Sequence, residues 1–317
     1  MFVRETGRAG RHSMRALIKL GWILAVCVPL AGACGDGEVG GDDDDVTGDG
    51  GVSGDGGGHA CQEHCPDAAP PSACRLVDMI IAVDPSGSMT EELVAIRDIV
   101  FPAFAQRLPQ VGMGLDNFRV ATLDACPDPA NYHTTNSAGA DCNFSSGQVW
   151  IDSSSPNLNA EFACVGDLDK RNNCTGDNDD EQPASAAAAS LEPPYSTGPN
   201  AGFSRPEALL VVLAITDEDE QPVPNATAQE VYDRLVATKF GDPKRIVFVG
   251  IGGGQPGGCN GAYGQADEAV KLRQITDLFM AQDRGVWWDL CQGNLEDGLD
   301  EAFAIIDRAC NELPPIP

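Results

Sequence analysis

The sequence predicts an α/β protein: an open, mostly parallel, doubly wound sheet flanked by helices, with a disulfide-pinned loop insertion. Three observations favour this class. Short, nearly continuous apolar runs, which are typical of strands buried on both faces, recur after residue 75. Segments with apolar residues at helical spacing separate these runs, as expected for a parallel sheet covered by helices. The alternation breaks between residues 126 and 180, where a polar stretch with four cysteines indicates an insertion at one edge of the sheet.

The strands and helices follow from these runs in chain order. Strands are expected at residues 76–83, 118–123, 148–151, 208–215, 245–251 and 286–290. The run at 148–151 is weak, and we therefore expect it at an edge of the sheet. Helices are expected at residues 90–108, 181–191, from 227, 266–280 and from 294. Pro102 should kink or split the first helix, and Thr227 with Glu230 predicts a capping box at the start of the third.

Residues 1–33 have the pattern of an export signal. Basic residues precede an apolar run at 20–30, which is shorter than the roughly 20 residues that a membrane-spanning helix needs. The small residues 31–33 lead into Cys34, and this arrangement resembles a bacterial lipobox, in which the cysteine is acylated. Cys34 is therefore the expected lipidation site. An ordinary secretory signal with an incidental cysteine is the alternative.

Three further parts are predicted after the signal. Residues 34–58 hold the lipidated cysteine and a tract of almost only glycine and acids, which we expect to be a solvated tether. Residues 59–75 form a Cys-rich N-terminal extension, and residues 76–317 form the folded domain, with the insertion at about 126–180. This organisation predicts a lipid-anchored protein of the bacterial cell envelope, either periplasmic or at the cell surface.

The 317-residue chain is strongly acidic. It has 48 acidic against 20 basic residues, for a net charge of −28. Removal of residues 1–33 takes away five basic residues and one acidic residue, which leaves a net charge of −32. This charge excludes binding of nucleic acid or anionic lipid through a basic face. The lipid anchor is therefore the expected contact with a membrane.

The cysteine count agrees with export. Without Cys27 in the signal and Cys34, an even number remains, which predicts up to five disulfides in an oxidising compartment. The ten candidates are Cys61, Cys65, Cys74, Cys126, Cys142, Cys164, Cys174, Cys259, Cys291 and Cys310. The pairings expected from proximity are Cys126–Cys142, Cys164–Cys174, Cys259–Cys291, and Cys310 with Cys61, Cys65 or Cys74. The alternative for the N-terminal cluster is a zinc site made of His59, Cys61, His64 and Cys65, which an oxidising compartment disfavours.

Polar oxygens follow two of the predicted strands. Asp84, Ser86 and Ser88 come directly after the first strand, and Asp217 follows the strand at 208–215. In open α/β sheets, ligands bind beyond the carboxyl ends of the strands. Carboxylate and hydroxyl oxygens are the ligands that hard divalent cations such as Mg²⁺ prefer. The sequence therefore predicts a metal site at this edge of the sheet.

The segment 77–89 resembles the first strand and the Asp-x-Ser-x-Ser loop of von Willebrand factor type A domains. In that family the loop opens the metal-ion-dependent adhesion site, abbreviated MIDAS. The resemblance covers roughly residues 75–310. It implies five metal ligands, which are Asp84, Ser86, Ser88, Thr175 and Asp217. Thr175 is the best-placed candidate for the family's threonine, with Thr134 or Thr135 as alternatives.

The function implied by this resemblance is that of a non-enzymatic adhesion module. A bound Mg²⁺, or Ca²⁺ or Mn²⁺, would capture an acidic residue of a protein partner. Mainly neutral ligands leave the charge of the ion uncompensated, so a partner carboxylate can replace a bound water. A metal-dependent hydrolase with Glu218 or Asp219 as base is the alternative. A third option is a structural module whose metal only steadies the loops.

Two neighbouring features have more than one interpretation. Ser88 and Glu91 fit a capping box, so the first loop could serve only to cap the following helix. Asp219 and Glu220 are interpreted as part of a solvated acidic loop, with a second cation site as the alternative.

Overall fold

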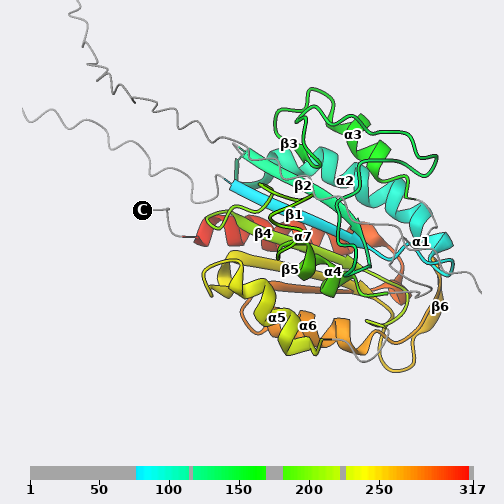
Figure 1. Ribbon diagram of the computed structural model, residues 1–317. Coiled ribbons are helices and arrows are strands. Elements are labelled where there is room, and N and C mark those ends of the chain that lie inside the picture. The colour runs from blue at the N-terminus through cyan, green and yellow to red at the C-terminus, as the bar shows by residue number, and fades with distance from the viewer. Residues whose placement is uncertain (1–75, 114–116, 169–180, 222–225, 314–317) are drawn as a thin grey trace, which may run out of the picture. The chain divides into compact units, whose positions relative to one another are not determined.

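The computed structural model describes residues 76–113, 117–168, 181–221 and 226–313 (Figure 1). Its strands are β1 Leu76–Val83, β2 Asn117–Asp124, β3 Ile151–Asp152, β4 Leu209–Ile215, β5 Ile246–Gly252 and β8 Gly285–Asp289. They form a six-stranded sheet in the order β3-β2-β1-β4-β5-β8. All neighbours are parallel except β3, which pairs antiparallel with β2 at the edge. This is the doubly wound order, and it confirms the predicted fold class.

The central strands are buried because their sequences are apolar on both faces. All seven residues of β4 are buried. Along β1, Met79 and Ile81 belong to one core cluster, whereas Ile80 and Ala82 belong to the other. The alternation of side chains along a strand thus gives each face of the sheet its own core.

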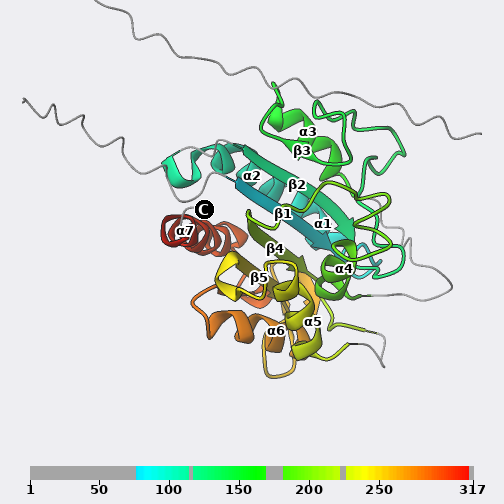
Figure 2. The same ribbon diagram turned by 60° about the vertical axis from the view of Figure 1, so that its left-hand side comes forward.

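Helices cover both faces of the sheet, as Figure 2 shows from a second direction. One core cluster takes residues from α1 Thr90–Ala95, α2 Phe101–Arg107 and α7 Leu295–Glu312. The other takes residues from α4 Pro183–Ser190, α5 Ala228–Ala237 and α6 Val270–Met280. The capping box predicted from Thr227 and Glu230 is present at the start of α5. Within the ranges described, no helix combines the length and apolarity that a membrane crossing needs.

The predicted helix at 90–108 is split at its proline. α1 continues into a π-helical turn at Ile96–Val100, and α2 follows. Pro102 stands near the start of α2 and has no backbone N–H, so it cannot donate to the carbonyl four residues earlier. A single wide turn beside the proline accommodates this missing hydrogen bond. A short 3₁₀ helix, Leu108–Met113, ends the segment.

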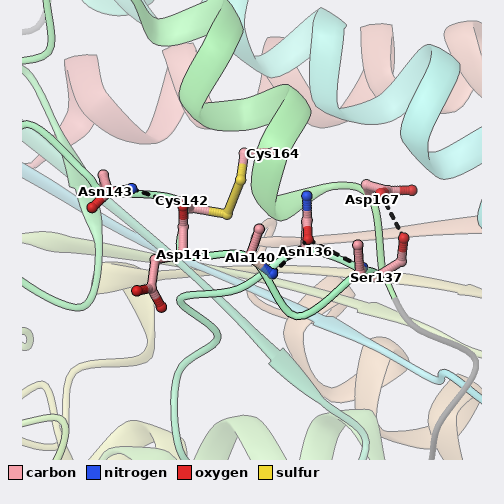
Figure 3. Close-up of a disulfide and its surroundings, with 9 residues drawn as sticks. Asn136, Ser137, Ala140, Asp141, Cys142, Asn143, Cys164 and Asp167 are labelled. Carbon is pink, nitrogen blue, oxygen red and sulfur yellow. Dashed lines mark hydrogen bonds between the residues drawn. A yellow bond between two sulfur atoms is a disulfide. The ribbon is translucent and has the colours of Figure 1, made fainter.

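The insertion is closed by a disulfide between Cys142 and Cys164 (Figure 3). Cys164 lies on α3, Leu158–Val165, a helix that the sequence did not predict. The side chain of Asn157 caps this helix by accepting a hydrogen bond from the backbone N–H of Ala160. The two cysteine Cα atoms are 5.6 Å apart, which is a normal separation for a disulfide.

This bond overturns two of the predicted pairings. Cys126–Cys142 and Cys164–Cys174 are wrong, because Cys142 and Cys164 are bonded to each other. The predicted pairs were chosen for short separations along the chain. The folding of α3 back over the preceding loop instead joins cysteines that are 22 residues apart.

A short hairpin after β5 was also not predicted. Its strands, β6 Cys259–Gly261 and β7 Gly264–Ala266, pair antiparallel. The disulfide Cys259–Cys291 confirms a predicted pairing and ties β6 to the 3₁₀ turn Leu290–Gln292 that follows β8. Because the chain is extended through β7, α6 begins at Val270 rather than at residue 266.

Several predicted features lie outside the described residues. These are the signal at 1–33, Cys34 and the tether, the extension at 59–75 with its cysteines and histidines, Cys174 and Thr175. Apart from the pairing of Cys174 with Cys164, the structure does not test what is predicted for them. Cys126 and Cys310 are described, and each is disulfide-bonded.

Candidate metal centre

The predicted oxygen ligands lie where the winding of the sheet changes direction. β1 and β4 are neighbours, and their last residues, Val83 and Ile215, are in register. The chain leaves β1 toward β2 on one side and leaves β4 toward β5 on the other. The backbone N–H of Asp84 donates to the carbonyl of Ile215 at 3.0 Å, so the two strand ends stay joined. In doubly wound folds, ligands bind where neighbouring strands connect to opposite sides of the sheet in this way.

The carboxylate of Asp84 is held in one orientation. Its Oδ1 accepts a hydrogen bond of 2.8 Å from the backbone N–H of Ser86. Its Oδ2 accepts one of 2.8 Å from the hydroxyl of Thr216. Asp84 and Thr216 are both fully buried, so this contact is shielded from water. Thr216 was not identified from the sequence, although its place directly before Asp217 at a strand end was a usable signal.

Hydroxyl groups connect the two strand ends. The Oγ atoms of Ser86 and Ser88 are 2.7 Å apart, and the hydroxyl of Ser88 donates to Oδ1 of Asp217 at 3.2 Å. Ser86 and Asp217 are buried, whereas Ser88 is exposed. The structure therefore brings Asp84, Ser86, Ser88 and Asp217 together in a cluster of oxygens that opens to solvent beside Ser88.

Ser88 does not cap the following helix. α1 begins at Thr90, and its N-cap residue, Met89, makes no side-chain capping bond. The expected capping box of Ser88 and Glu91 is therefore wrong. The hydroxyl of Thr90 instead donates to the carbonyl of Gly87 at 2.8 Å, which closes the turn. Ser88 is left with its hydroxyl directed toward Asp217.

A third carboxylate lies close to the cluster. Glu92, on α1, is only 1% exposed, and its Oε2 has no hydrogen-bond partner among the described residues. The pKa of Glu92 is raised to about 7, chiefly by burial, and the charges of Glu91 and Asp84 contribute to the same shift. The sequence offered no signal for Glu92, because its position on the buried face of α1 depends on packing.

The electrostatics of the cluster match a cation. The pKa of Asp217 is raised to about 7, chiefly by burial and in addition by the nearby carboxylates of Asp84 and Glu92. Neither Asp217 nor Glu92 pairs with a basic side chain in the part of the chain that the structure describes. Buried carboxylates with adjacent hydroxyls form an all-oxygen donor set without a compensating charge, which fits a hard divalent ion.

The acids that follow Asp217 serve a different purpose. Asp219 accepts hydrogen bonds from the backbone N–H groups of Lys271 and Leu272 at the start of α6. Glu220 is buried and accepts from the N–H groups of Ala184 and Ser185 at the start of α4. The expected solvated loop is thus incorrect for Glu220. Both acids satisfy helix N-termini and so fix the loop that presents Asp217.

Neither of the two described threonine candidates is brought to the cluster. Thr175 lies outside the described residues. Thr135 pairs with Asp141 in an isolated bridge of the insertion. Thr134 lines a separate hollow with Asp141 and Asn143. The structure therefore gives neither alternative a place beside Asp217.

One other group of ligand atoms lies close together. Cys259, Asp289 and Cys291 have ligand atoms within 4.8 Å of one another. The two sulfurs form a disulfide, so they are not the thiolates that bind metal. Asp289 accepts a hydrogen bond from the N–H of Cys291 and so caps the turn after β8, which explains its position without a metal.

No protein-family model and no curated protein match the chain. Among solved structures, it is similar to proximal thread matrix protein 1 from the mussel byssus, at 15% identity and a TM-score of 0.43 for one crystal form. A structure of that protein with a zinc-occupied MIDAS motif has 16% identity and a TM-score of 0.43. Each match covers 75% of this chain and 49% of the other, so the chain spans about half the length of that protein. The fold described above is defined by this chain's own strand order.

Proposed function

We propose that this protein is a metal-dependent protein-interaction module whose divalent cation is held at the ends of β1 and β4. The ligands would be Asp84, Ser86, Ser88 and Asp217, with Thr175 as the fifth. The orientation of Ser88 carries this proposal. Its hydroxyl contacts Ser86 and Asp217 instead of capping α1, which a purely structural turn would not require.

The chemistry of the ligands supports capture of an acidic group. When bound, the cation supplies an electrophilic position to which a partner carboxylate can attach. Ser86 and Ser88 are neutral donors, and the hydrogen bonds from Ser86 and Thr216 already engage both oxygens of Asp84. With neutral hydroxyls among its ligands, the ion would keep water at part of its coordination shell, and an anionic ligand from outside can replace such a water. Mg²⁺ is the proposed ion, with Ca²⁺ or Mn²⁺ as substitutes.

The proposed location is the bacterial cell envelope. The export pattern of residues 1–33, Cys34 and the acidic tether support a lipid-anchored protein, periplasmic or at the cell surface. The two disulfides among the described residues agree with an oxidising compartment. Radiolabelled palmitate incorporation in the expression host, compared with Cys34→Ser, tests the anchor. Equal labelling of both proteins would show that Cys34 is not the lipidation site.

Calorimetry tests the metal site directly. Titration with MgCl₂ should show one binding event that is lost in Asp84→Ala and Ser86→Ala. Asp233→Ala is the matched control, because Asp233 is an exposed acid on α5 and should leave the binding unchanged. If both site variants bind Mg²⁺ as well as the original protein, the assignment of the site is wrong.

We also propose that the protein is not an enzyme. The hydrolase alternative needs a base near the ion, and Asp219 is engaged at the N-terminus of α6, which leaves Glu218 as the candidate. Generic phosphoesters and peptides should be unchanged after incubation with the protein in MgCl₂. Turnover that EDTA abolishes, and that Glu218→Gln lacks, would establish the hydrolase instead.

A further inference from the structure

A cavity of 490 Å³ adjoins the proposed metal site. Ser88 and Asp217 belong to both, so a ligand held by the cation would extend directly into it. The opposite wall is the β6–β7 hairpin, which contributes Asn260, Gly264 and Gln265. The disulfide Cys259–Cys291 anchors that hairpin. A cavity of this size can take a side chain of a bound protein.

The lining of the cavity is acidic. Glu91, Glu218 and Asp267 line it in addition to Asp217, and no lysine or arginine does so. None of these four carboxylates forms an ion pair with a basic residue in the ranges that the structure describes. The metal can compensate only the carboxylates that bind it. Glu91, Glu218 and Asp267 therefore keep their charges beside the site.

A buried acceptor lies close to the wall of the cavity. A β-carbon at Gly264 would lie 2.9 Å from Oε1 and 3.5 Å from Oε2 of Glu92, so this carboxylate lies directly behind the glycine. Gly264 lines the cavity, and because it has φ of +106° and no side chain, Glu92 can lie close to this part of the cavity wall. Oε2 of Glu92 is the buried atom without a hydrogen-bond partner. Such an atom in a native structure calls for a donor.

We infer that this cavity binds a lysine or arginine side chain of the partner, next to the carboxylate that the cation captures. The inference rests on the proposed function and adds to it a second feature of the partner. An ammonium or guanidinium group supplies the positive charge that Glu91, Glu218 and Asp267 lack. It also supplies hydrogen-bond donors for the carboxylate of Glu92 and for the amide oxygens of Asn260 and Gln265. The recognised motif is thus an acidic residue with a basic neighbour.

The cation and the basic side chain would act together. A partner with acidic residues alone would meet the repulsion of Glu91, Glu218 and Asp267 once its carboxylate reached the ion. A basic neighbour converts this repulsion into attraction. Tenfold in affinity corresponds to about 1.4 kcal/mol, which is at the low end of the coupling between close charge pairs in protein interfaces. An effect of about tenfold is therefore a modest expectation.

Short peptides that differ at one position provide the test. Each carries one aspartate, followed at a spacing of one to four residues either by arginine or by citrulline, which has nearly the same shape but no charge. A parallel pair replaces the aspartate by asparagine. Affinities for the full-length protein are measured by fluorescence anisotropy in MgCl₂ and in EDTA. At one of the spacings, the aspartate–arginine peptide should bind about tenfold more tightly than its citrulline twin in MgCl₂.

Variants assign the effect to the cavity. Glu91→Gln and Glu218→Gln should each reduce the preference for arginine over citrulline. The aspartate–citrulline affinity should not fall, because each change removes a carboxylate that repels the captured aspartate, and calorimetry should still show Mg²⁺ binding. Glu91 is exposed and Glu218 is partly exposed, so the fold should tolerate the changes. The matched control is Glu207→Gln, which changes the same charge just before β4, at the other end of the strand from the site.

The outcomes separate this inference from the proposed function. If arginine and citrulline peptides bind equally at every spacing, the inference is wrong, whatever MgCl₂ does. If an arginine preference that Glu218→Gln removes persists without any effect of MgCl₂, the metal-dependent function fails and the basic pocket stands. If calorimetry finds a second Mg²⁺ that Glu91→Gln abolishes, the cavity holds an ion and the inference is overturned.

Discussion

At the residue scale, the site depends on carboxylates that are buried before any ion is bound. Asp84 is fixed by hydrogen bonds from Ser86 and Thr216. Asp217 has one hydrogen bond from Ser88, and Oε2 of Glu92 has none. Buried charges without partners cost free energy of folding. The protein therefore carries a local instability at the place where it is proposed to bind a cation.

Glu92→Gln should make the metal-free protein more stable at neutral and alkaline pH. Burial raises the pKa of Glu92 from 4.5 to about 7, so the folded state keeps its proton over a range where the unfolded chain has lost it. The resulting destabilisation is absent below pH 4.5, grows up to pH 7 and is complete above it. Urea unfolding in EDTA at pH 8 should show a gain of up to about 3 kcal/mol for the variant. At pH 4 the two proteins should be equally stable.

The exposed neighbour provides the control for this pH dependence. Glu91→Gln should change the unfolding free energy little at either pH, because Glu91 is solvated. A Glu92→Gln protein that is less stable than the original at pH 8 would contradict the prediction.

Thr216→Val should weaken both the fold and the metal site. Valine keeps the shape but leaves Oδ2 of the buried Asp84 without its 2.8 Å hydrogen bond. The expected loss of stability is about 1–3 kcal/mol. The expected loss of Mg²⁺ affinity is about 10- to 100-fold, as for other groups that orient metal ligands. Urea unfolding and calorimetry measure the two effects.

A second buried threonine separates these effects. Thr276 donates to the carbonyl of Leu272 within α6 and has no contact with the site. Thr276→Val should therefore change stability without changing Mg²⁺ affinity. Equal affinities in the Thr216 and Thr276 variants would show that Thr216 does not orient Asp84.

At the element scale, the disulfide Cys259–Cys291 holds the hairpin β6–β7, and the disulfide Cys142–Cys164 closes a loop within the insertion. Both bonds close loops of similar length, with separations of 32 and 22 residues. The surroundings of the two bonds differ. Cys259–Cys291 holds a wall of the acidic cavity, whereas Cys142–Cys164 lies within the insertion (Figure 3).

Removal of the two disulfides should therefore have similar effects on stability and different effects on binding. Replacement of either cysteine pair by serine should cost roughly 3–4 kcal/mol by the chain-entropy model. Only Cys259→Ser with Cys291→Ser should reduce the preference for arginine-containing peptides. Denaturant curves and peptide affinities check both statements. A loss of arginine preference in the Cys142/Cys164 variant as well would mean that the cavity wall is not the cause.

At the scale of the whole molecule, a bound cation should stabilise the fold by mass action. Mg²⁺ at a hundred times its dissociation constant should raise the unfolding free energy by about 2.7 kcal/mol, and EDTA should remove this gain. NaCl at the same ionic strength is the control, because screening of the net charge of −28 also favours the compact state. Asp84→Ala should respond alike to both salts. A larger effect of MgCl₂ on that variant would place the ion elsewhere.

Much of the fold could be predicted because its signals are local. The runs at 76–83 and 208–215 are apolar on both faces, and polar residues at their ends mark where β1 and β4 stop. Parallel strands place such ends at one edge of the sheet, so Asp84 and Asp217 could be paired across 133 positions without coordinates. The break at Pro102 followed from its missing N–H.

Other features depended on contacts between distant segments. The sequence alone determined the alternation of strands and helices and the oxygen-bearing strand ends, because strand burial and turn chemistry act over a few residues. Only the tertiary structure decided that Cys142 bonds Cys164, that Thr216 holds Asp84, and that the glycine of a small hairpin lies over Glu92. Such pairings are set by how helices and loops pack against the sheet, and each cysteine, threonine or glutamate by itself is compatible with many partners.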